Sequence, residues 1–346
     1  MKMMKCMLES ASRLLGHAGQ RLRPCMAALA AVAAVAAVAA ASLPLGAAAA
    51  GWKPEHPVTM VVPYAAGGGT DAQARVVAKE LSQLWGQPVV VENLGGADGL
   101  IGTRRVIDAK PNGLTLLVQL PSITLIRHLP AFKGTDPVSQ LVPVSAFSTL
   151  PGVVAANAAM PVATMTEMVR HCKTAAPPCS LGTTENMARL QARMLGEESA
   201  LPNLIVANYK GGGQLITDLV ANNVSFAIAG STAVLPHVRS GALKVIMTMG
   251  NKRSSILPEV PTAIEQGFTS FDATTWYGIF VPKGTPADIQ QGIATALREA
   301  AKSEAVRKAF TTIGAEPLGN TPAEFAAMVQ RERDRADALA KRFPLE

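Results

Sequence analysis

The stretch Pro63-Tyr64-Ala65-Ala66-Gly67-Gly68-Gly69-Thr70-Asp71-Ala72-Gln73 decides the fold. It follows the strand-like run Val58-Thr59-Met60-Val61-Val62 and precedes a helical pattern that extends to Trp85. A strand, a glycine loop and a helix in this order commonly hold an anion against the amides at the helix N-terminus. The stretch therefore predicts a βα unit with an anion site at the first turn of its helix.

The helix after the glycine loop has a clear expected start and a clear buried face. Thr70 is expected to be its N-cap, and Gln73 three residues later completes the capping-box pattern. Apolar residues then recur on one face at helical spacing, at Ala74, Val77, Ala78, Leu81 and Leu84. We therefore expect this face to be core, and the amides of Gly68, Gly69 and Asp71 to be free to bind a ligand.

Strand and helix patterns alternate along the chain, as in an α/β protein. Strand-like runs begin at Val58, Pro88, Leu114, Gly152, Leu204, Ser225, Lys244 and Tyr277. Helical stretches are expected at 72–85, 164–175, 188–195, 214–221, 286–302 and 322–341. Without its first fifty residues the chain has about 296 residues, which suits two α/β lobes with mostly parallel sheets.

The first fifty residues read as a secretory signal peptide. Residues 1–25 carry five basic residues and one acid, residues 26–45 form an alanine-valine run, and small residues follow at 46–50. This order of basic, apolar and small segments is typical of a signal that is cleaved on export. The alternative is an N-terminal membrane anchor, because the apolar run is about long enough to span a bilayer.

Charge and cysteine content change once residues 1–50 are set aside. The chain has 32 basic and 25 acidic residues, and removing five and one leaves 27 against 24, a net charge of +3. This balance, without a basic stripe, argues against nucleic-acid binding. Cys172 and Cys179 remain as an even pair in an oxidising compartment, so we expect a disulfide; two free thiols are the alternative. The absence of histidine-cysteine clusters argues against a zinc site.

The glycine loop has a second interpretation, as the dinucleotide or phosphate site of a secreted α/β enzyme. Gly67 to Ala72 satisfies G-x-G-x-x-A, and Glu92 closes a second strand about twenty residues later. Against this, four residues separate Val62 from the first glycine, and Asp71 would face a doubly charged pyrophosphate. The Gly-Lys-Ser/Thr end of a Walker loop is absent, and no Ser/His/Asp pattern is visible, so we expect no enzyme activity.

A second glycine cluster, Glu92-Asn93-Leu94-Gly95-Gly96-Ala97-Asp98-Gly99-Leu100-Ile101-Gly102, again lies between a strand and the start of a helix. Together with Pro63-Tyr64-x-Ala66-Gly67-Gly68-x-x-Asp71, it resembles the Bug family of periplasmic solute receptors, the extracytoplasmic component of tripartite tricarboxylate transporters. The similarity continues in family order at 111–117, 137–145, 209–213, 235–241, 257–262, 276–278 and 281–286.

This resemblance implies a two-lobed, type II Venus-flytrap fold with two crossover strands, near residues 145–150 and 273–278. The first lobe would comprise residues 51–149 and 276–346, and the second lobe residues 150–275. The implied protein is a monomeric periplasmic receptor without a cofactor. It binds a di- or tricarboxylate, an amino acid or an aromatic acid, and serves uptake with tripartite transporter membrane subunits, or sensing.

The resemblance also implies the ligand-binding residues, which come from loops of both lobes. They are Tyr64, Ala66, Gly67, Gly68, Gly69, Thr70, Asp71, Ser122, Thr183, Thr184, Asn186, Arg189 and Gly212. For Asp71 we expect a bracing role in the loop, and the alternative is a contact with an amino or hydroxyl group of the ligand. Trp276, at the second crossover, is expected to pack rather than to bind.

The loop from Leu181 to Leu190 departs from the family pattern. Two of the usual glycines are absent, the loop is shorter, and Arg189 stands where the family has a histidine. Two acids usual in the family are replaced by Ser225 and Ala229. Fewer acids and an added arginine predict a more anionic ligand, with at least two carboxylates, although Arg189 as a solvated helix residue is the alternative.

Overall fold

The computed structural model describes residues 51–130, 132–209, 211–250, 252–271 and 274–345. The predicted signal peptide lies outside these residues. The strands are β1 (Val58–Val62), β2 (Val89–Asn93), β3 (Thr115–Gln119), β4 (Leu141–Asn157), β5 (Ser180–Thr183), β6 (Ile205–Asn208), β7 (Phe226–Gly230), β8 (Leu243–Thr248), β9 (Thr274–Pro282) and β10 (Glu316–Pro317). All eight expected strand-like runs therefore form strands.

The helices cover the runs predicted for them and add several others. They are α2 (Gly69–Trp85), α3 (Leu100–Ile107), α4 (Met165–Thr174), α5 (Asn186–Glu198), α6 (Gly212–Val220), α7 (Ser231–Arg239), α8 (Ala287–Lys302), α9 (Glu304–Ile313) and α10 (Pro322–Arg342). Short 3-10 helices are η1 (Ala97–Gly99), η2 (Pro121–His128), η3 (Pro137–Gln140) and η4 (Thr269–Phe271). Within the described residues, no helix is long and apolar enough to span a membrane.

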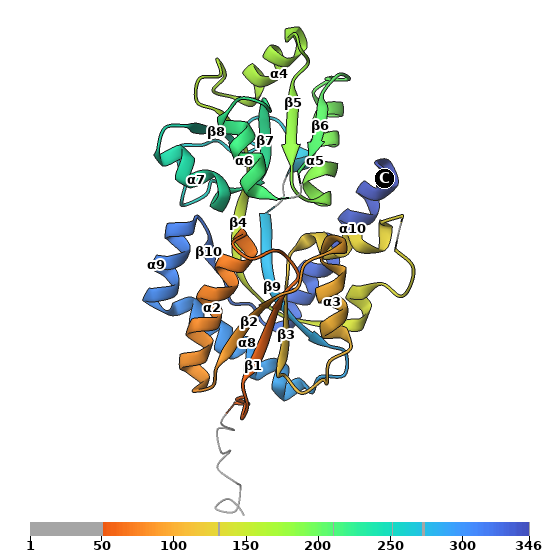
Figure 1. The fold of residues 1–346 in the computed structure, drawn as a ribbon, viewed down its shortest axis with the longest axis vertical. Helices are drawn as coiled ribbons and strands as arrows, with labels where there is room; N and C mark the ends of the chain where they lie inside the picture. Colours follow the sequence, from red (N-terminus) through yellow and green to blue (C-terminus); the bar gives the residue numbers. More distant parts are fainter. Residues whose placement is uncertain (1–50, 131, 210, 251, 272–273, 346) are drawn as a thin grey trace, which may run out of the picture. The chain divides into compact units, whose positions relative to one another are not determined.

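The strands pair in the order β2-β1-β3-β9-β4-β7-β5-β6, with β8 and β10 also paired to β4 (Figure 1). Strand β1 is parallel to β2 and β3, and β5 is parallel to β6 and β7. Strand β9 runs antiparallel to β3 and β4, and β4 runs antiparallel to β7, β8 and β10. The expectation of mostly parallel sheets was therefore wrong, because β4 and β9 enter between the parallel groups in the opposite direction.

The long strand β4 joins two groups of strands. Its residues from Leu141 to Pro151 pair with β9, and its residues from Gly152 to Asn157 pair with β7 and β8. Figure 1 shows β5 to β8 in the upper part of the view and β1 to β3 in the lower part, with β4 between them. We name these groups sheet A (β1, β2, β3, β9, β10 and the first part of β4) and sheet B (β5 to β8 and the rest of β4).

Helices cover both faces of each sheet, which explains why the strands read as nearly continuous apolar runs. One face of sheet A packs against α2, α8 and α9, and its other face packs against α3, η2 and the first half of α10. In this second core Trp276 is buried beside Phe280 and Phe325, so it packs as expected. Sheet B packs against α4 and α5 on one face and against α6 and α7 on the other.

Helix α10 contacts both groups of strands. Phe325 and Val329 belong to a core of sheet A, whereas Ala336, Leu339 and the following Leu345 belong to a core that contains residues of β5 and α5. The domain boundaries at 149–150 and 275–276 stay predictions. These boundaries place all of residues 276–346 in the first lobe, whereas Ala336, Leu339 and Leu345 also pack against sheet B.

Two local expectations have different outcomes. Helix α2 starts one residue before Thr70: Gly68 is the N-cap in an extended conformation (φ −77°, ψ 169°), and no side chain caps it. The N-cap role expected for Thr70 was therefore wrong. The helix already begins at Gly69, and Thr70 lies buried in its first turn. The sulfur atoms of Cys172 and Cys179 form a disulfide, with Cα atoms 5.4 Å apart.

Candidate functional site

The predicted site residues lie mainly in loops that leave the carboxyl ends of the parallel strands. Strands β1, β2 and β3 lead into the starts of α2, η1 and η2, and strands β5, β6 and β7 lead into α5, α6 and α7. In α/β folds this edge of the sheet is the usual place for a ligand, since loops and helix N-termini meet there.

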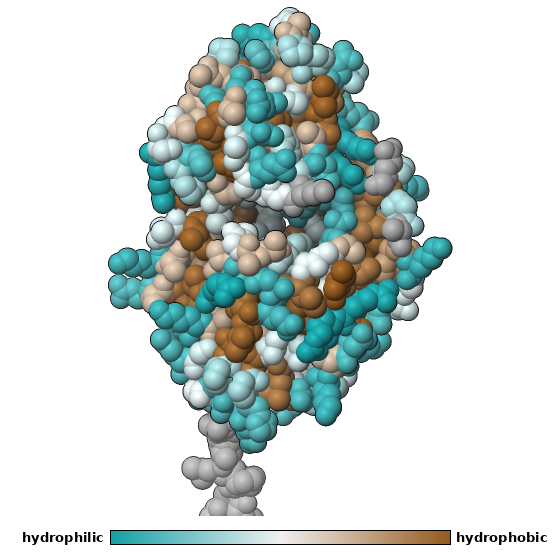
Figure 2. All heavy atoms as spheres, in the orientation of Figure 1, coloured by the Kyte–Doolittle hydropathy of each residue, from teal (hydrophilic) through white to brown (hydrophobic). Residues whose placement is uncertain are grey.

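Three close approaches join the loops of sheet A to those of sheet B. The Asn186 amide donates a hydrogen bond to the Asp98 carboxylate (2.9 Å), and the Ser122 hydroxyl donates one to the Glu185 carboxylate. A Cβ at Gly69 would lie 3.9 Å from the Thr232 Cβ, so the first turns of α2 and α7 are also neighbours. Figure 2 shows a hollow near the middle of the molecule in this view. The candidate site is the cleft between these loops.

The loop before α2 is held in shape by Asp71. Its buried carboxylate accepts hydrogen bonds from the Gly67 amide (2.9 Å) and from Arg75 Nε (3.1 Å), and a second Arg75 nitrogen lies 2.9 Å from its other oxygen. Gly67 has φ +81°, a conformation that favours glycine. Asp71 therefore has the bracing role expected for it.

The bracing by Asp71 limits which amides can bind a ligand. The Gly67 amide is already engaged by Asp71, so it is not free to bind an anion. The first intrahelical bond of α2 runs from the Ala72 amide to the Gly68 carbonyl (3.0 Å), which leaves the amides of Gly69, Thr70 and Asp71 without an intrahelical acceptor. These three amides have no side-chain cap, and a helix N-terminus of this kind is suited to an anion.

Replacing Asp71 by asparagine should lower the free energy of unfolding by roughly 1 kcal/mol at pH 7, since a hydrogen bond to a charged acceptor exceeds a neutral one by about that amount. Burial alone would raise the pKa of Asp71, but hydrogen bonds from Arg75, Gly67 and Asn93 outweigh it and lower this pKa below 3.8. The difference between wild type and Asp71→Asn should therefore persist above pH 4 and disappear as the pH falls through the lowered folded-state pKa.

Urea unfolding at pH 7 and at about pH 3 measures this difference. Asp288→Asn is the matched control, because Asp288 is an exposed acid in the first turn of another helix, α8. An equal loss of stability in both variants would contradict the specific bracing role of Asp71.

Tyr64 and Ser122 line the sheet A side of the cleft. The half-buried Tyr64 hydroxyl donates to the Gln119 side chain (3.0 Å), which in turn donates to the Thr103 hydroxyl (2.9 Å). Burial raises the pKa of Tyr64, and the nearby carboxylates of Glu185 and Asp98 raise it further. Tyr64 is thus a neutral hydroxyl at physiological pH, and its oxygen can still accept a hydrogen bond.

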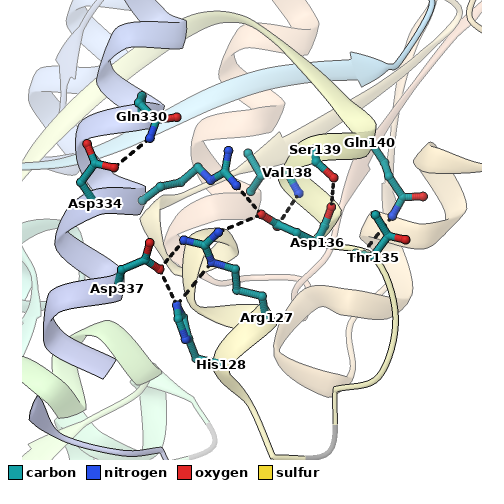
Figure 3. A network of polar contacts seen from close by, with 11 residues as sticks. Arg127, His128, Thr135, Asp136, Val138, Ser139, Gln140, Gln330, Asp334 and Asp337 are labelled. Carbon is teal, nitrogen blue, oxygen red and sulfur yellow. Dashed lines mark hydrogen bonds and ion pairs between the residues drawn. The ribbon is translucent and has the colours of Figure 1, made fainter. Parts of the chain in front are cut away.

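The segment that carries Ser122 is anchored at its far end by a charged network (Figure 3). Arg127 at the end of η2 pairs with Asp136 (3.2 Å) and with Asp337 of α10, and His128 lies 2.7 Å from the same Asp337 carboxylate. Burial would raise the pKa of Asp337, but hydrogen bonds from His128 and Arg127 lower it. These contacts fix η2 between the sheet and α10, and so they fix the position of Ser122.

The sheet B side of the cleft contains unsatisfied polar groups. Thr183 is fully buried at the carboxyl end of β5, and its hydroxyl has no hydrogen-bond partner among the described residues. Thr184 and Arg189 are half-buried, and the buried Nε of Arg189 likewise has no partner there. Buried donors without acceptors are rare and costly, so these groups are candidates to contact a ligand or a bound water.

Arg189 is therefore not a fully solvated helix residue. It lies in the first turns of α5, on the side of the helix that also carries Asn186. Arg193, one turn further, donates to the Pro344 carbonyl (3.1 Å) and is also half-buried, so it is not a fully solvated residue either.

The remaining predicted residues differ in how close they come to the cleft. Ala66 and Gly68 are exposed in the loop before α2. Gly212 is the first residue of α6, after the edge strand β6, and an added Cβ there would meet no atom within 4 Å. Gly212 therefore lies at the edge of sheet B, and its place in the ligand site stays a prediction.

Sequence reasoning missed Glu185, Asp98 and Thr232 and misjudged Ser225. Ser225 precedes β7, so it lies at the opposite edge of sheet B, where its hydroxyl accepts a hydrogen bond from the Ser180 amide (3.1 Å). The family usually has an acid at position 225, but this position lies away from the cleft, so the change to serine does not alter the charge of the cleft. The signal that the sequence offered for Glu185 was an acid in the loop from Leu181 to Leu190, where the family pattern is rich in glycine.

Comparisons with known proteins agree with this architecture. The chain matches the family model described as "Tripartite tricarboxylate transporter family receptor" over residues 73–345. It is 34% identical over 287 residues to Protein BugT of Bordetella pertussis (strain Tohama I), a match that covers 82% of this chain and 87% of BugT.

Solved structures show the same fold. The periplasmic binding protein BugD matches with a TM-score of 0.75 at 31% identity, over 84% of this chain and 98% of BugD. Rpa4515 of R. palustris, solved with adipate, matches with a TM-score of 0.76 at 26% identity, over 83% of this chain and 97% of that protein. MatC from Rhodopseudomonas palustris, solved with bound malate, matches with a TM-score of 0.72 at 26% identity, over 83% of this chain and 99% of MatC. These matches confirm the expected family and the two-domain α/β fold of periplasmic binding proteins, and the chain belongs to the tripartite tricarboxylate transporter family of receptors.

Proposed function

We propose that this receptor binds a small organic carboxylate in the cleft between the loops of sheets A and B. The observation that carries the proposal is the uncapped first turn of α2, where the amides of Gly69, Thr70 and Asp71 lack intrahelical acceptors. A helix N-terminus attracts an anion through these amides and through its dipole, and the effect strengthens when water is excluded. The Thr183 hydroxyl and the Arg189 Nε, which have no hydrogen-bond partner among the described residues, add donors on the opposite side.

The chemistry of related proteins supports a carboxylate rather than a phosphate. Rpa4515 was solved with adipate and MatC with malate, and both of these ligands are dicarboxylates. In this chain the Asp71 carboxylate already accepts the Gly67 amide, so the glycine loop contains its own anion at that position. A pyrophosphate would have to approach this negative charge, which disfavours the nucleotide interpretation.

The biological setting is proposed from family membership. A periplasmic receptor family implies a location outside the cytoplasmic membrane. We propose that residues 1–50 direct export and are then cleaved. The loaded receptor would act as a monomer and would either deliver its ligand to tripartite transporter membrane subunits or serve as a sensor, without converting the ligand. Within the described part of the chain, no group of three or more His, Cys, Asp or Glu side chains could hold a metal ion.

A thermal-shift screen of the purified protein against organic acids tests this function. The panel contains succinate, malate, aspartate, adipate, citrate and benzoate, with NAD and ATP as non-carboxylate candidates. A ligand that binds the folded state should add about 1.4 kcal/mol of stability for each tenfold rise in concentration above its Kd. Stabilisation by a nucleotide but by none of the acids would contradict the proposal.

A further inference from the structure

Glu185 lies where the loop after β5 meets α5, and its side chain is turned toward the loops of sheet A. Its backbone forms the N-cap of α5 (φ −145°, ψ 159°), but its carboxylate does not cap the helix. Instead the carboxylate accepts a hydrogen bond from the Ser122 hydroxyl, which belongs to η2. An N-cap side chain usually accepts from an amide of the first turn, so this acid is directed at the cleft rather than at its own helix.

The surroundings of Glu185 supply little that would balance its charge. Burial raises the pKa of its carboxyl, the Ser122 hydrogen bond lowers it, and the nearby acids Glu332 and Asp98 raise it again. Among the described residues, none of the ion pairs involves Glu185. A carboxylate can accept about four hydrogen bonds, and the Ser122 hydroxyl accounts for one of them.

The space beside Glu185 is polar and small. A cavity of about 20 Å³ is lined by Glu185 and Glu332, by Gln191, by the threonines at 274 and 275, and by Pro121 and Met187. A cavity of this size holds about one water molecule. The carboxylate of Glu185 therefore has a polar region next to it where a small donor, rather than an apolar group, would be accommodated.

We propose that Glu185 is a specificity-determining residue of the cleft, which selects carboxylic acids that also carry an ammonium group. This inference rests on the proposed function, because the ligand carboxylate is held by the α2 amides. The ammonium group then pairs with Glu185 and supplies the missing counter-charge. A hydroxyl group donates to the same carboxylate without neutralising it, so hydroxy acids bind more weakly than amino acids and more tightly than unsubstituted acids.

Titration calorimetry with matched acids tests the proposal. Succinate, malate and aspartate share a four-carbon skeleton and differ in carrying hydrogen, hydroxyl or ammonium, and glutarate, 2-hydroxyglutarate and glutamate form the five-carbon set. Propionate, lactate and alanine form the set with one carboxylate. In the set that binds, the amino acid should bind about tenfold more tightly than the unsubstituted acid, a difference of 1.4 kcal/mol.

The variant Glu185→Gln keeps the shape of the side chain and an oxygen that accepts from Ser122, but removes the charge. It should abolish the tenfold preference for the amino acid and leave the unsubstituted acid bound equally well or better. Glu259→Gln, the same change at an exposed residue, should leave every affinity unchanged. An unaltered preference in Glu185→Gln, or equal binding of the three acids by wild type, would overturn the assignment.

The pH dependence of the wild-type preference gives a second measurement that needs no variant. The preference should be present at neutral pH and fade as the pH falls through the raised pKa of Glu185, since a protonated carboxyl cannot pair with ammonium. The same carboxyl is also near four other titratable groups, those of Asp98, Glu332, Tyr64 and Tyr277. If the affinities of Glu185→Gln still depend on pH, that dependence belongs to these groups. If no acid binds at all, the proposed function fails; if acids bind without preference, this inference alone fails.

Discussion

Replacing Phe325 by alanine should lower the free energy of unfolding by about 3–5 kcal/mol, the usual cost of truncating a buried aromatic residue. The Phe325 side chain is fully buried between α10 and β9. Its ring centroid lies 5.1 Å from that of Trp276 and 5.2 Å from that of Phe280, both in edge-on arrangements. The truncation removes these contacts and leaves a cavity under a helix that contacts both sheets. Urea unfolding followed by circular dichroism measures the loss.

Gly278 of β9 provides a matched test of this packing. A Cβ at residue 278 would lie 2.1 Å from the Cζ atom of Phe325, so Gly278→Ala should be strongly destabilising in the wild-type chain. In the Phe325→Ala background the ring is gone, and the added methyl group should cost much less. A double-mutant cycle measures this coupling. Additive losses in the double variant would contradict the close contact between residues 278 and 325.

The elements of the fold could be predicted from the sequence wherever they depend on local pattern. Runs such as Val58–Val62 are apolar because both faces of their sheet are covered, and the helical repeat after Thr70 follows the buried face of α2. Pairing direction is not local. The first part of β4 contains two prolines, Pro143 and Pro151, and two serines, so it does not read as a strand. Its pairing with β9 joins residues far apart in the chain.

The start of α2 shows why a good local pattern can still mislead. Thr70 and Gln73 have the spacing of a capping box, but Gln73 is fully buried and its side chain accepts a hydrogen bond from Ser148 of β4. That partner is 75 residues away, so no local rule could supply it. The glycines before Thr70 can start the helix without a side-chain cap, and the uncapped amides are what a ligand needs.

The parts of the candidate site that consist of backbone amides in glycine loops could be predicted from the sequence. The side-chain contacts between the loops of sheets A and B could not. Glycine clusters after two strands identified the loops of sheet A, because loops that lead from a strand into an anion-binding helix N-terminus are commonly rich in glycine. For Glu185 the sequence shows only an acid in the loop from Leu181 to Leu190, which does not reveal what its side chain contacts. Its importance depends on Ser122, which is 63 residues earlier in the chain, and on a pKa raised by burial that the sequence alone does not reveal.

Replacing Arg189 by alanine should weaken the binding of a dicarboxylate by about ten- to a hundredfold, the equivalent of roughly 1.5–3 kcal/mol for a charge-assisted hydrogen bond. Arg189 is half-buried in the first turns of α5, and its buried Nε has no partner among the described residues. A ligand with one carboxylate on the α2 amides would place its second carboxylate near Thr183, Thr184 and Arg189. Titration calorimetry with the acid selected by the thermal-shift screen measures the change.

The choice of control and of ligand decides how the Arg189→Ala result is interpreted. Arg170 is exposed on α4, so Arg170→Ala should change the affinity by less than about twofold, as for most exposed charges. Arg193 is unsuitable as a control, because it donates to the Pro344 carbonyl near the C-terminal end of the chain. A monocarboxylate analogue should lose little affinity in Arg189→Ala, since it has no second group to place there. Equal affinities of wild type and Arg189→Ala for the dicarboxylate would leave the α2 amides as the main anion contact and would return Arg189 to a purely structural role.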